Sequence, residues 1–287
     1  MASILITGGT GSFGQAFVRH ILDGQEYDRI CIFSRGEQTQ AAMAQKLASK
    51  RLRFLIGDVR DRWRLTRACD GVDVVVHAAA LKRIEVGFYN PVEMVRTNIE
   101  GAINVVEAAR DSGVAKVVFL SSDKAYQPIS PYGQSKALAE RIFLAGNAGA
   151  GPRFACTRYG NVWNSAGSVF PTWRRLLSNG ATTVTVTDPD CTRFFMYMRE
   201  AVEIVYDAIA TMQGGETFIP TLPAYRLGDL AEAMSAKYNV VGLPGWEKQH
   251  ESMGPGNSSE KAKRLSVQEI KDIIHETESE GTDGSSL

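Results

Sequence analysis

The sequence predicts an α/β fold built on a doubly wound parallel sheet. Through residues 1–150, short apolar runs alternate with longer amphipathic runs, as expected when strands alternate with helices. The apolar runs are rich in Val, Ile, Leu and Phe and lack polar alternation, which is typical of strands buried on both faces. A glycine-rich turn directly follows the first run. Together these observations indicate a Rossmann-like domain, followed by a smaller C-terminal α/β substrate lobe.

The elements of the first domain follow from this pattern. The expected strands are residues 4–7, 29–33, 52–56, 72–77 and 116–120. One helix carries the apolar stripe Phe13, Phe17, Ile21 and Leu22. A second begins at Asn90-Pro91, a favoured helix start, and runs to Arg110; a third contains Lys136 and continues through Ala145.

The pattern changes after Gly151-Pro152. We expect strands at 153–159, 182–186 and 217–220, and helices at 168–178, 199–212, 227–235 and 265–274. We therefore place a cofactor-binding domain at residues 1–160, with a core that extends into later segments, and a substrate-binding lobe at 161–275 that closes a cleft. Residues 276–287 are small, polar and acidic, and we expect them to be disordered.

Composition excludes several classes of protein. The 287 residues carry 32 Lys and Arg against 32 Asp and Glu, so the neutral balance gives no support for nucleic-acid or membrane-surface binding. The four cysteines are far apart, which favours free buried thiols. The chain shows neither a signal-peptide pattern nor an apolar run long enough to span a membrane. We expect a cytoplasmic protein.

The glycine-rich turn is the first candidate site. Gly8, Gly11 and Gly14 lie between the first strand and the first helix, where they permit a tight turn and close approach of the backbone to a ligand. The helix N-terminus then offers N–H groups and a positive dipole end to a pyrophosphate. The pattern predicts a dinucleotide site that also includes Thr10, Ser12 and Phe13.

The end of the second strand indicates which dinucleotide binds. An acidic residue there would favour NAD, whereas this chain has Ser34 and Arg35, which suit the 2′-phosphate of NADP. The alternative is that Arg35 is merely solvated. Further expected cofactor contacts follow later strands or lie farther along the chain: Asp58, Val59, Ala78, Ala79, Ala80, Lys82, Asn98 and Val162. Lys82 could reach either cofactor or substrate.

The stretch 121–136, SSDKAYQPISPYGQSK, carries the candidate catalytic residues. Tyr132 and Lys136 are four residues apart at a helix start and therefore share one helix face. Asp123 and Lys124 lie upstream, directly after the fifth strand. The alternatives are a helix-start aromatic residue packed against the sheet and an exposed charged pair.

Together with the glycine turn, this stretch resembles the extended short-chain dehydrogenase/reductase superfamily. The resemblance implies that Tyr132 as phenolate accepts a sugar hydroxyl proton and that Lys136 lowers the tyrosine pKa and holds the nicotinamide ribose. It also implies that Ser122 hydrogen-bonds the same substrate oxygen.

A sharper resemblance covers residues 3–275. GGTGSFG, FSRGEQ, HAAALK, SSDKAYQPISPYGQSK, RYGNVWNSAGSV, TRFF and EKQHESM occur in that order, and they resemble the UDP-N-acetylglucosamine 4,6-dehydratases. Tyr132 favours the soluble short 5-inverting type, because members that retain configuration usually carry methionine there and have a membrane-anchored extension.

This resemblance implies a role for the upstream charged pair. Hydride leaves the fourth carbon for NADP while Tyr132 takes the hydroxyl proton, and Lys124 then removes the proton on the fifth carbon while Asp123 protonates the departing hydroxyl of the sixth. Hydride returns to the sixth carbon, so the cofactor is regenerated and should stay bound. Reprotonation of the fifth carbon from the opposite face inverts it.

The substrate side matches the family less well. The resemblance assigns nucleotide-sugar contacts to Asn161 and Arg193, although Arg193 could equally serve a structural partner, and Ser168-Val169 opens a helix suited to a diphosphate. The family usually has arginine where this chain has Ala166, and another just before EKQHE, near Leu243. Either Arg226, Lys248 or another cation substitutes, or the substrate is not UDP-N-acetylglucosamine.

Two other functions remain open at this point. An NADP-dependent epimerase or oxidoreductase of a nucleotide sugar needs Tyr132 and Lys136 but not Asp123 and Lys124. A non-enzymatic dinucleotide sensor needs none of the four. By analogy with the superfamily, we also expect a homo-oligomer that pairs the helices at 91–110 and 133–145.

Overall fold

The computed structural model describes residues 2–282. The chain divides into two compact units. Of the described residues, those up to Tyr159 and those from Arg199 to Pro220 form unit 1, and those from Gly160 to Met198 and from Thr221 onward form unit 2.

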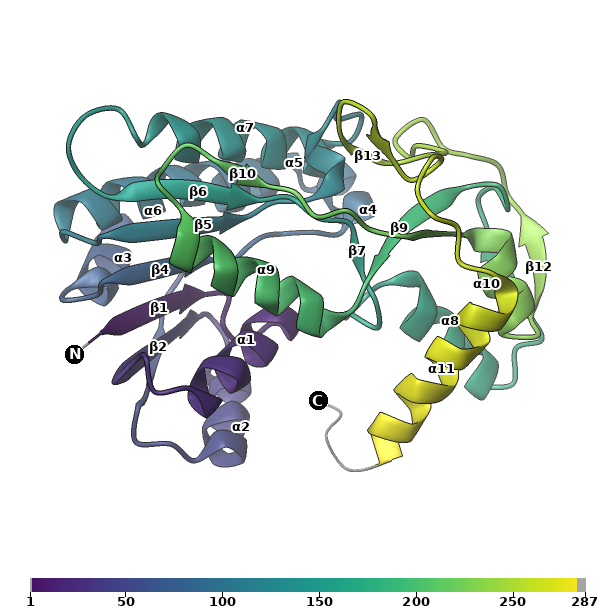
Figure 1. Ribbon diagram of the computed structural model, residues 1–287, viewed down its shortest axis with the longest axis horizontal. Coiled ribbons are helices and arrows are strands. Elements are labelled where there is room, and N and C mark those ends of the chain that lie inside the picture. The colour runs from purple at the N-terminus through teal and green to yellow at the C-terminus, as the bar shows by residue number, and fades with distance from the viewer. Residues whose placement is uncertain (1, 283–287) are drawn as a thin grey trace. The chain divides into compact units, whose positions relative to one another are not determined.

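Unit 1 is built on a seven-stranded sheet in the order β10-β6-β5-β4-β1-β2-β3, with every neighbouring pair parallel (Figure 1). This arrangement confirms the predicted Rossmann-like sheet. The strands are β1 (Ser3–Thr7), β2 (Arg29–Ser34), β3 (Leu52–Ile56), β4 (Val74–His77), β5 (Lys116–Leu120), β6 (Arg153–Thr157) and β10 (Thr217–Phe218).

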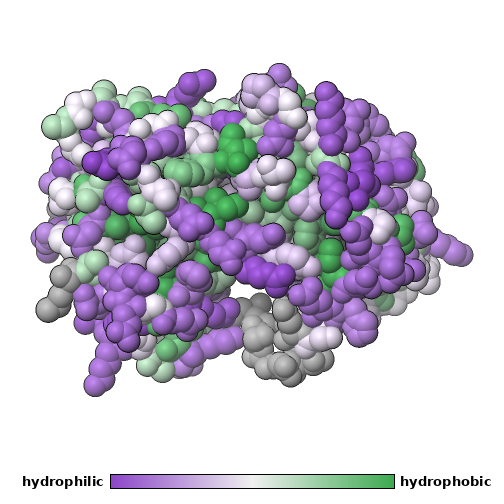
Figure 2. Space-filling model, in the orientation of Figure 1, coloured by the Kyte–Doolittle hydropathy of each residue, from purple (hydrophilic) through white to green (hydrophobic). Residues whose placement is uncertain are grey.

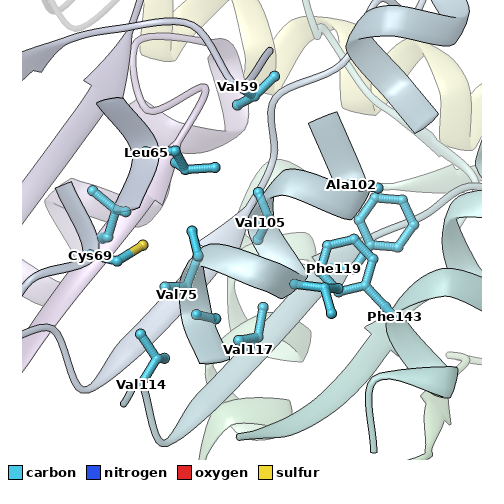
Figure 3. Packing of buried hydrophobic residues seen from close by; sticks show 14 of the residues in the cluster. Val59, Leu65, Cys69, Val75, Ala102, Val105, Val114, Val117, Phe119 and Phe143 are labelled. Atoms are coloured by element: carbon cyan, nitrogen blue, oxygen red, sulfur yellow. The ribbon is translucent and has the colours of Figure 1, made fainter. Parts of the chain in front are cut away.

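Helices cover this sheet. They are α1 (Ser12–Asp23), α2 (Glu37–Leu47), α3 (Arg62–Cys69), α4 (Ile84–Tyr89), α5 (Pro91–Met94), α6 (Gly101–Asp111), α7 (Pro131–Ala145) and α9 (Met198–Thr211). One core joins alternate strand residues to α3, α6 and α7, as the labelled Val75, Val117 and Phe119 show beside Val105 and Phe143 (Figure 3). His20 of α1 packs edge-on against Tyr206 of α9, so these two helices are neighbours.

The helix predicted from Asn90-Pro91 to Arg110 is confirmed as one uninterrupted run of helical backbone, with a π-helical segment in its middle. It is α5, then a π-helical segment η1 (Val95–Glu100), then α6. The wider turn brings Thr97 and Asn98 into the interior, where both are buried. π-Helical insertions are frequent at functional sites, and periodicity alone does not reveal them.

Unit 2 contains three small sheets, ordered β11-β9-β7, β12-β8 and β13-β14. Its elements are β7 (Asn161–Val162), α8 (Val169–Ser178), β8 (Thr183–Val186), β9 (Thr192–Met196), β11 (Ala224–Arg226), α10 (Leu227–Ala233), β12 (Lys237–Val240), β13 (Ser252–Gly254), β14 (Asn257–Ser258) and α11 (Val267–Thr282). Trp163 stacks on Phe170 and contacts Phe195 at the centre of its core.

The prediction of disorder from residue 276 is wrong for residues 276–282, which belong to α11. Two hydrogen bonds hold this part of the helix: Trp163 Nε1 donates to Thr277 Oγ1 at 2.9 Å, and Tyr197 donates its hydroxyl proton to Glu276 at 2.9 Å. These tertiary partners override a composition that alone favours disorder. Residues 283–287 lie outside the described residues.

All four cysteines are buried and free, as predicted. Among the described residues, no helix is both long and apolar enough to cross a membrane. Hydrophilic residues cover most of the face shown in Figure 2, with small apolar areas between them.

Candidate active site

The predicted cofactor and catalytic segments of unit 1 follow the carboxyl ends of adjacent strands. Thr7 pairs with Phe33 and with His77, and His77 pairs with Phe119, so the ends of β1, β2, β4 and β5 are level. The glycine turn, Ser34-Arg35, Ala78–Ala80 and the stretch from Ser121 therefore emerge along one edge of the sheet. This is the edge at which doubly wound folds bind ligands.

The glycine turn has the geometry of a phosphate-binding loop. Gly8 has a φ of +67°, and a Cβ there would lie 2.8 Å from the backbone N of Ala79. A Cβ on Gly14 would lie 2.6 Å from the carbonyl oxygen of Gly9. In the described helix α1, no side chain caps the first turn and no acidic side chain lies in it. The positive end of α1, with exposed Gly11 as its N-cap, therefore suits a pyrophosphate.

The predicted adenosine-ribose contacts lie at the ends of β2 and β3. Gln40 donates to the hydroxyl of Ser34 at 3.0 Å, which orients that hydroxyl. Arg35 is 60% exposed and 4.0 Å from Asp58, which forms a closer pair with Arg60 at 2.7 Å. Burial raises the pKa of Asp58, but the hydrogen bonds and charge of Arg60, with the charge of Arg35, lower it overall. Asp58 lies closer to Arg60 than to Arg35, so it neutralises the charge of Arg35 only in part. The remaining positive charge of Arg35 faces solvent.

Asp123 and Lys124 form a contact pair directly after β5, in the short 3₁₀ turn η2 (Asp123–Ala125). Lys124 Nζ lies 3.2 Å from Asp123 Oδ1, which also accepts a hydrogen bond from the Ser122 hydroxyl at 2.8 Å. The backbone N–H of Asp123 donates to the Tyr159 carbonyl at 2.9 Å, which fixes the turn against the end of β6. Asp123 is 1% exposed, so the alternative of an exposed charged pair is wrong.

Tyr132 lies beside this pair at the start of α7. Burial raises its pKa, while the charge of Lys124 and a side-chain hydrogen bond with Ser122 lower it. Ser122 therefore links Tyr132 to Asp123. The resemblance implies a pKa-lowering charge on Lys136; the charge of Lys124 also lowers the pKa of Tyr132, against the larger effect of burial.

Lys136 points toward the sheet. It is 4% exposed, its Nζ donates to the carbonyl oxygen of Leu120, and it lies 4.1 Å from the centre of the Phe119 ring. Burial lowers the pKa of Lys136 to about 7, against the charge of Glu140, which raises it.

The sequence did not predict that Gly133 and Asn98 position this site. Gly133 packs against the carbonyl of Lys124, and a Cβ there would also lie 3.1 Å from Pro128 Cβ. Asn98 was predicted to contact the cofactor. In the structure its side-chain amide accepts a hydrogen bond from the backbone N–H of Leu81 and donates to the Leu81 carbonyl and the Ser135 hydroxyl, at 2.8–2.9 Å. Asn98 thus holds the loop before Lys82 against the helix that carries Tyr132 and Lys136.

Of the predicted substrate contacts, Lys82 and Lys124 belong to unit 1, and the others belong to unit 2: Asn161, Ser168, Val169, Arg193 and Arg226. Asn161 and Val162 form β7, paired with β9, and both are partly exposed. Ser168 and Val169 begin α8, whose described first turn has no acidic side chain and no side-chain cap. Within the described residues, the buried Ser168 Oγ makes no hydrogen bond. The positive end of the α8 helix dipole is therefore not neutralised by a nearby side chain in the first turn, and it suits an anionic group.

The predicted contact of Arg193 with substrate phosphates does not agree with its placement. Arg193 is 5% exposed, and its guanidinium donates to the carbonyls of Thr192 and Gln249 and to Glu247. It therefore holds the segment 247–251, the structural alternative that the sequence left open. Arg226 is exposed and pairs with Asp190.

Comparison with known proteins agrees with this geometry. A family model described as polysaccharide biosynthesis protein matches residues 4–273. The chain is 43% identical to a UDP-N-acetylglucosamine 4,6-dehydratase (inverting) of Campylobacter jejuni, over 88% of this chain and 77% of that one. It is 38% identical to a UDP-glucose 4-epimerase of Rickettsia akari, over 92% and 80%.

Solved structures show the same fold. Pen from Bacillus thuringiensis superposes with a TM-score of 0.90 at 32% identity, covering 96% of this chain and 98% of that one. DesIV, a dTDP-glucose 4,6-dehydratase of Streptomyces venezuelae solved with NAD, superposes at 0.82 with 23% identity, covering 95% and 96%. The family match and the relatives confirm the resemblance drawn from the motifs, and the chain belongs to the polysaccharide biosynthesis protein family.

Proposed function

We propose that this protein is a nucleotide-sugar 4,6-dehydratase that acts on UDP-N-acetylglucosamine. The observation that carries the proposal is the contact between Lys124 Nζ and Asp123 Oδ1 at 3.2 Å, linked through Ser122 to Tyr132. Oxidation alone needs only Tyr132 and Lys136. Elimination of water also needs a base and an acid on neighbouring carbons, and the Asp123–Lys124 pair supplies both.

Tyr132 acts first. As phenolate it takes the proton of the hydroxyl on the fourth carbon; burial raises the pKa of Tyr132, and the charge of Lys124 and a side-chain hydrogen bond with Ser122 counter that rise. A nicotinamide dinucleotide held at the glycine turn of Gly8, Gly11 and Gly14 would supply the redox chemistry, taking hydride from the fourth carbon and returning it to the sixth.

Lys124 and Asp123 act next. Passage of one proton from the Lys124 ammonium to the Asp123 carboxylate converts the resting ion pair into a neutral amine and a neutral acid. The amine then removes the proton on the fifth carbon, which the ketone at the fourth carbon acidifies. The acid protonates the hydroxyl that leaves the sixth carbon as water. The elimination balances in protons, because the pair gives one proton to the leaving water and gains one from the fifth carbon. After hydride returns to the sixth carbon, the fifth carbon takes a proton from solvent, and Tyr132 releases to solvent the proton that it took from the hydroxyl of the fourth carbon.

We propose NADP as the cofactor because Ser34 and the exposed Arg35 stand at the end of β2. Arg35→Ala should weaken binding of NADP by about tenfold, the worth of one charged contact of about 1.4 kcal/mol, and leave NAD binding unchanged. Calorimetric titration of both cofactors measures this. Equal losses for NADP and NAD would assign Arg35 to another role.

The Campylobacter relative supports UDP-N-acetylglucosamine as the substrate and inversion at the fifth carbon. The Rickettsia relative supports the alternative, an epimerase of a UDP-sugar. Asn161, Ser168 and Val169 remain our predicted substrate contacts, with Arg226 or Lys248 in place of the arginines that the family has near Ala166 and Leu243.

Mass spectrometry of the product separates the two functions. Incubation with UDP-N-acetylglucosamine in heavy water should give a product that has lost water, about 18 mass units before the label is counted, and that carries deuterium at the fifth carbon. An epimerase would give a product of unchanged mass without that label.

We also propose a homo-oligomer. Apolar side chains stand exposed along α5, η1, α6 and α7: Val92 (59%), Val95 (44%), Ile103 (43%) and Leu138 (49%). Contact with a second copy of the chain would remove these side chains from water. Light scattering should give at least twice the mass of one chain, and Val95→Glu with Leu138→Glu should reduce it; a wild-type monomer would refute the proposal.

A further inference from the structure

Two buried charged side chains and one partly buried charged side chain form a cluster in unit 1. Lys136 and Glu140 lie four residues apart on α7 and so share one face of that helix. Arg158, just after β6, donates to both carboxylate oxygens of Glu140, from Nε at 2.9 Å and from Nη2 at 2.5 Å. The exposed fractions are 4% for Lys136, 5% for Glu140 and 15% for the Arg158 side chain.

Uncharged groups form most of the remaining surroundings of Lys136. His77 on β4 lies at the Phe119 and Phe143 rings, and burial lowers its pKa to about 3, so the imidazole is neutral. Burial raises the pKa of the Cys156 thiol on β6, so that group is neutral too. Tyr132, one turn earlier on α7, has a raised pKa. Glu140 is therefore the anion that supports the Lys136 ammonium.

Arg158 competes with Lys136 for that anion. Its two-pronged hydrogen bond draws the carboxylate charge toward β6, so Lys136 experiences a partly neutralised Glu140. This arrangement can set how readily Lys136 loses its proton.

We propose that Glu140 is a positioning residue that keeps Lys136 protonated during turnover, and that Arg158 limits the strength of this effect. The catalytic consequence rests on the proposed function, because a protonated Lys136 matters only where it holds the cofactor ribose beside Tyr132. The electrostatic part does not depend on the substrate.

Two substitutions at the same ion pair test the proposal because they act in opposite directions. Glu140→Gln removes the anion and keeps the shape, so the alkaline limb of the kcat/KM profile should move down by about one pH unit, a tenfold loss on that side. Arg158→Gln leaves Glu140 unshared, so the same limb should move up. Glu107→Gln, which breaks the exposed pair with Arg62, is the matched control and should leave the profile unchanged.

A measurement without substrate makes the test independent of the reaction. In the ¹⁵N NMR titration of Lys136 Nζ in the cofactor-free protein, Glu140→Gln should lower the midpoint and Arg158→Gln should raise it. If a single substitution prevents folding, the double variant Glu140→Leu with Arg158→Met removes the pair without stranding a buried charge, and should behave as Glu140→Gln does. Shifts in the same direction, or no shift, would overturn the proposal. Correct shifts in an enzyme that does not dehydrate a sugar would refute only the proposed function.

Discussion

The contact between Gly133 and the catalytic turn gives a prediction whose size can be worked out. Gly133 is the third residue of α7, directly after Tyr132, and the carbonyl of Lys124 packs on it. Gly133→Ala places a methyl group into that carbonyl and 3.1 Å from Pro128 Cβ. Because a backbone group cannot swing away as a side chain can, the turn that carries Asp123 and Lys124 must move.

Two opposing effects set the change in stability. Alanine gains about 1 kcal/mol over glycine in a helix. Overpacking a tight contact costs about 1–3 kcal/mol. The net loss in free energy of unfolding should be about 0–2 kcal/mol, so the variant should still fold. Activity should suffer more, because moving the acid–base pair by about 1 Å can lower the rate about a hundredfold.

The assay is urea unfolding beside steady-state dehydration of UDP-N-acetylglucosamine. Gln134→Ala is the control, because it also raises helix propensity but lies on an exposed residue next to Gly133. If Gly133→Ala turned over at the rate of the control, the inference that Gly133 positions the catalytic turn would be refuted.

Three further predictions follow from the structure. Lys124→Met should still allow the cofactor to be reduced, seen as nicotinamide absorbance, while product formation falls about 10²–10⁴-fold for lack of the base; an unchanged rate of product formation would contradict the mechanism. Burial lowers the pKa of His77 to about 3. Between pH 6.5 and 3 the unfolded chain therefore binds a proton at His77 that the folded chain does not. Acidification through this range should lower the free energy of unfolding by about 1.4 kcal/mol for each pH unit. Urea unfolding of wild type and His77→Asn across that range should show the steeper acid loss in the wild type, and parallel curves would disprove the burial argument. Ala48 ends α2 with a φ of 37°, a region that favours glycine, so Ala48→Gly should raise the free energy of unfolding by about 0.5–1 kcal/mol, and a lower urea midpoint would refute this.

The sequence predicted the central sheet well because buried parallel strands leave a strong local signal. β1, β2, β3, β4 and β5 all lie where apolar runs occur, with ends that differ by at most two residues. Unit 2 was harder. β9 lies in a stretch noted only for its TRF motif, and its strand state depends on pairing with β7 and β11. Such short strands are defined by partners distant in sequence, which local propensity does not contain.

The residues of the site also fall into two groups, those that a local sequence pattern reveals and those whose contacts arise only in the folded chain. The spacing of Tyr132 and Lys136 and the Asp123-Lys124 dipeptide are local patterns, so the sequence could point to them. The clamp by Asn98, the contact of Gly133 with the Lys124 carbonyl, and the pairing of Glu140 with Arg158 arise only when separate elements meet. Arg193 shows the converse, since a motif arginine turned out to be enclosed by Glu247 and backbone carbonyls.

Isotope transfer within the substrate tests the central claim most directly. UDP-N-acetylglucosamine labelled with deuterium at the fourth carbon should give a dehydrated product with that deuterium at the sixth carbon, because the hydride that is removed is returned within one turnover. NMR locates the label. Deuterium found back on the fourth carbon of a sugar that has lost no water would contradict the account and establish an epimerase.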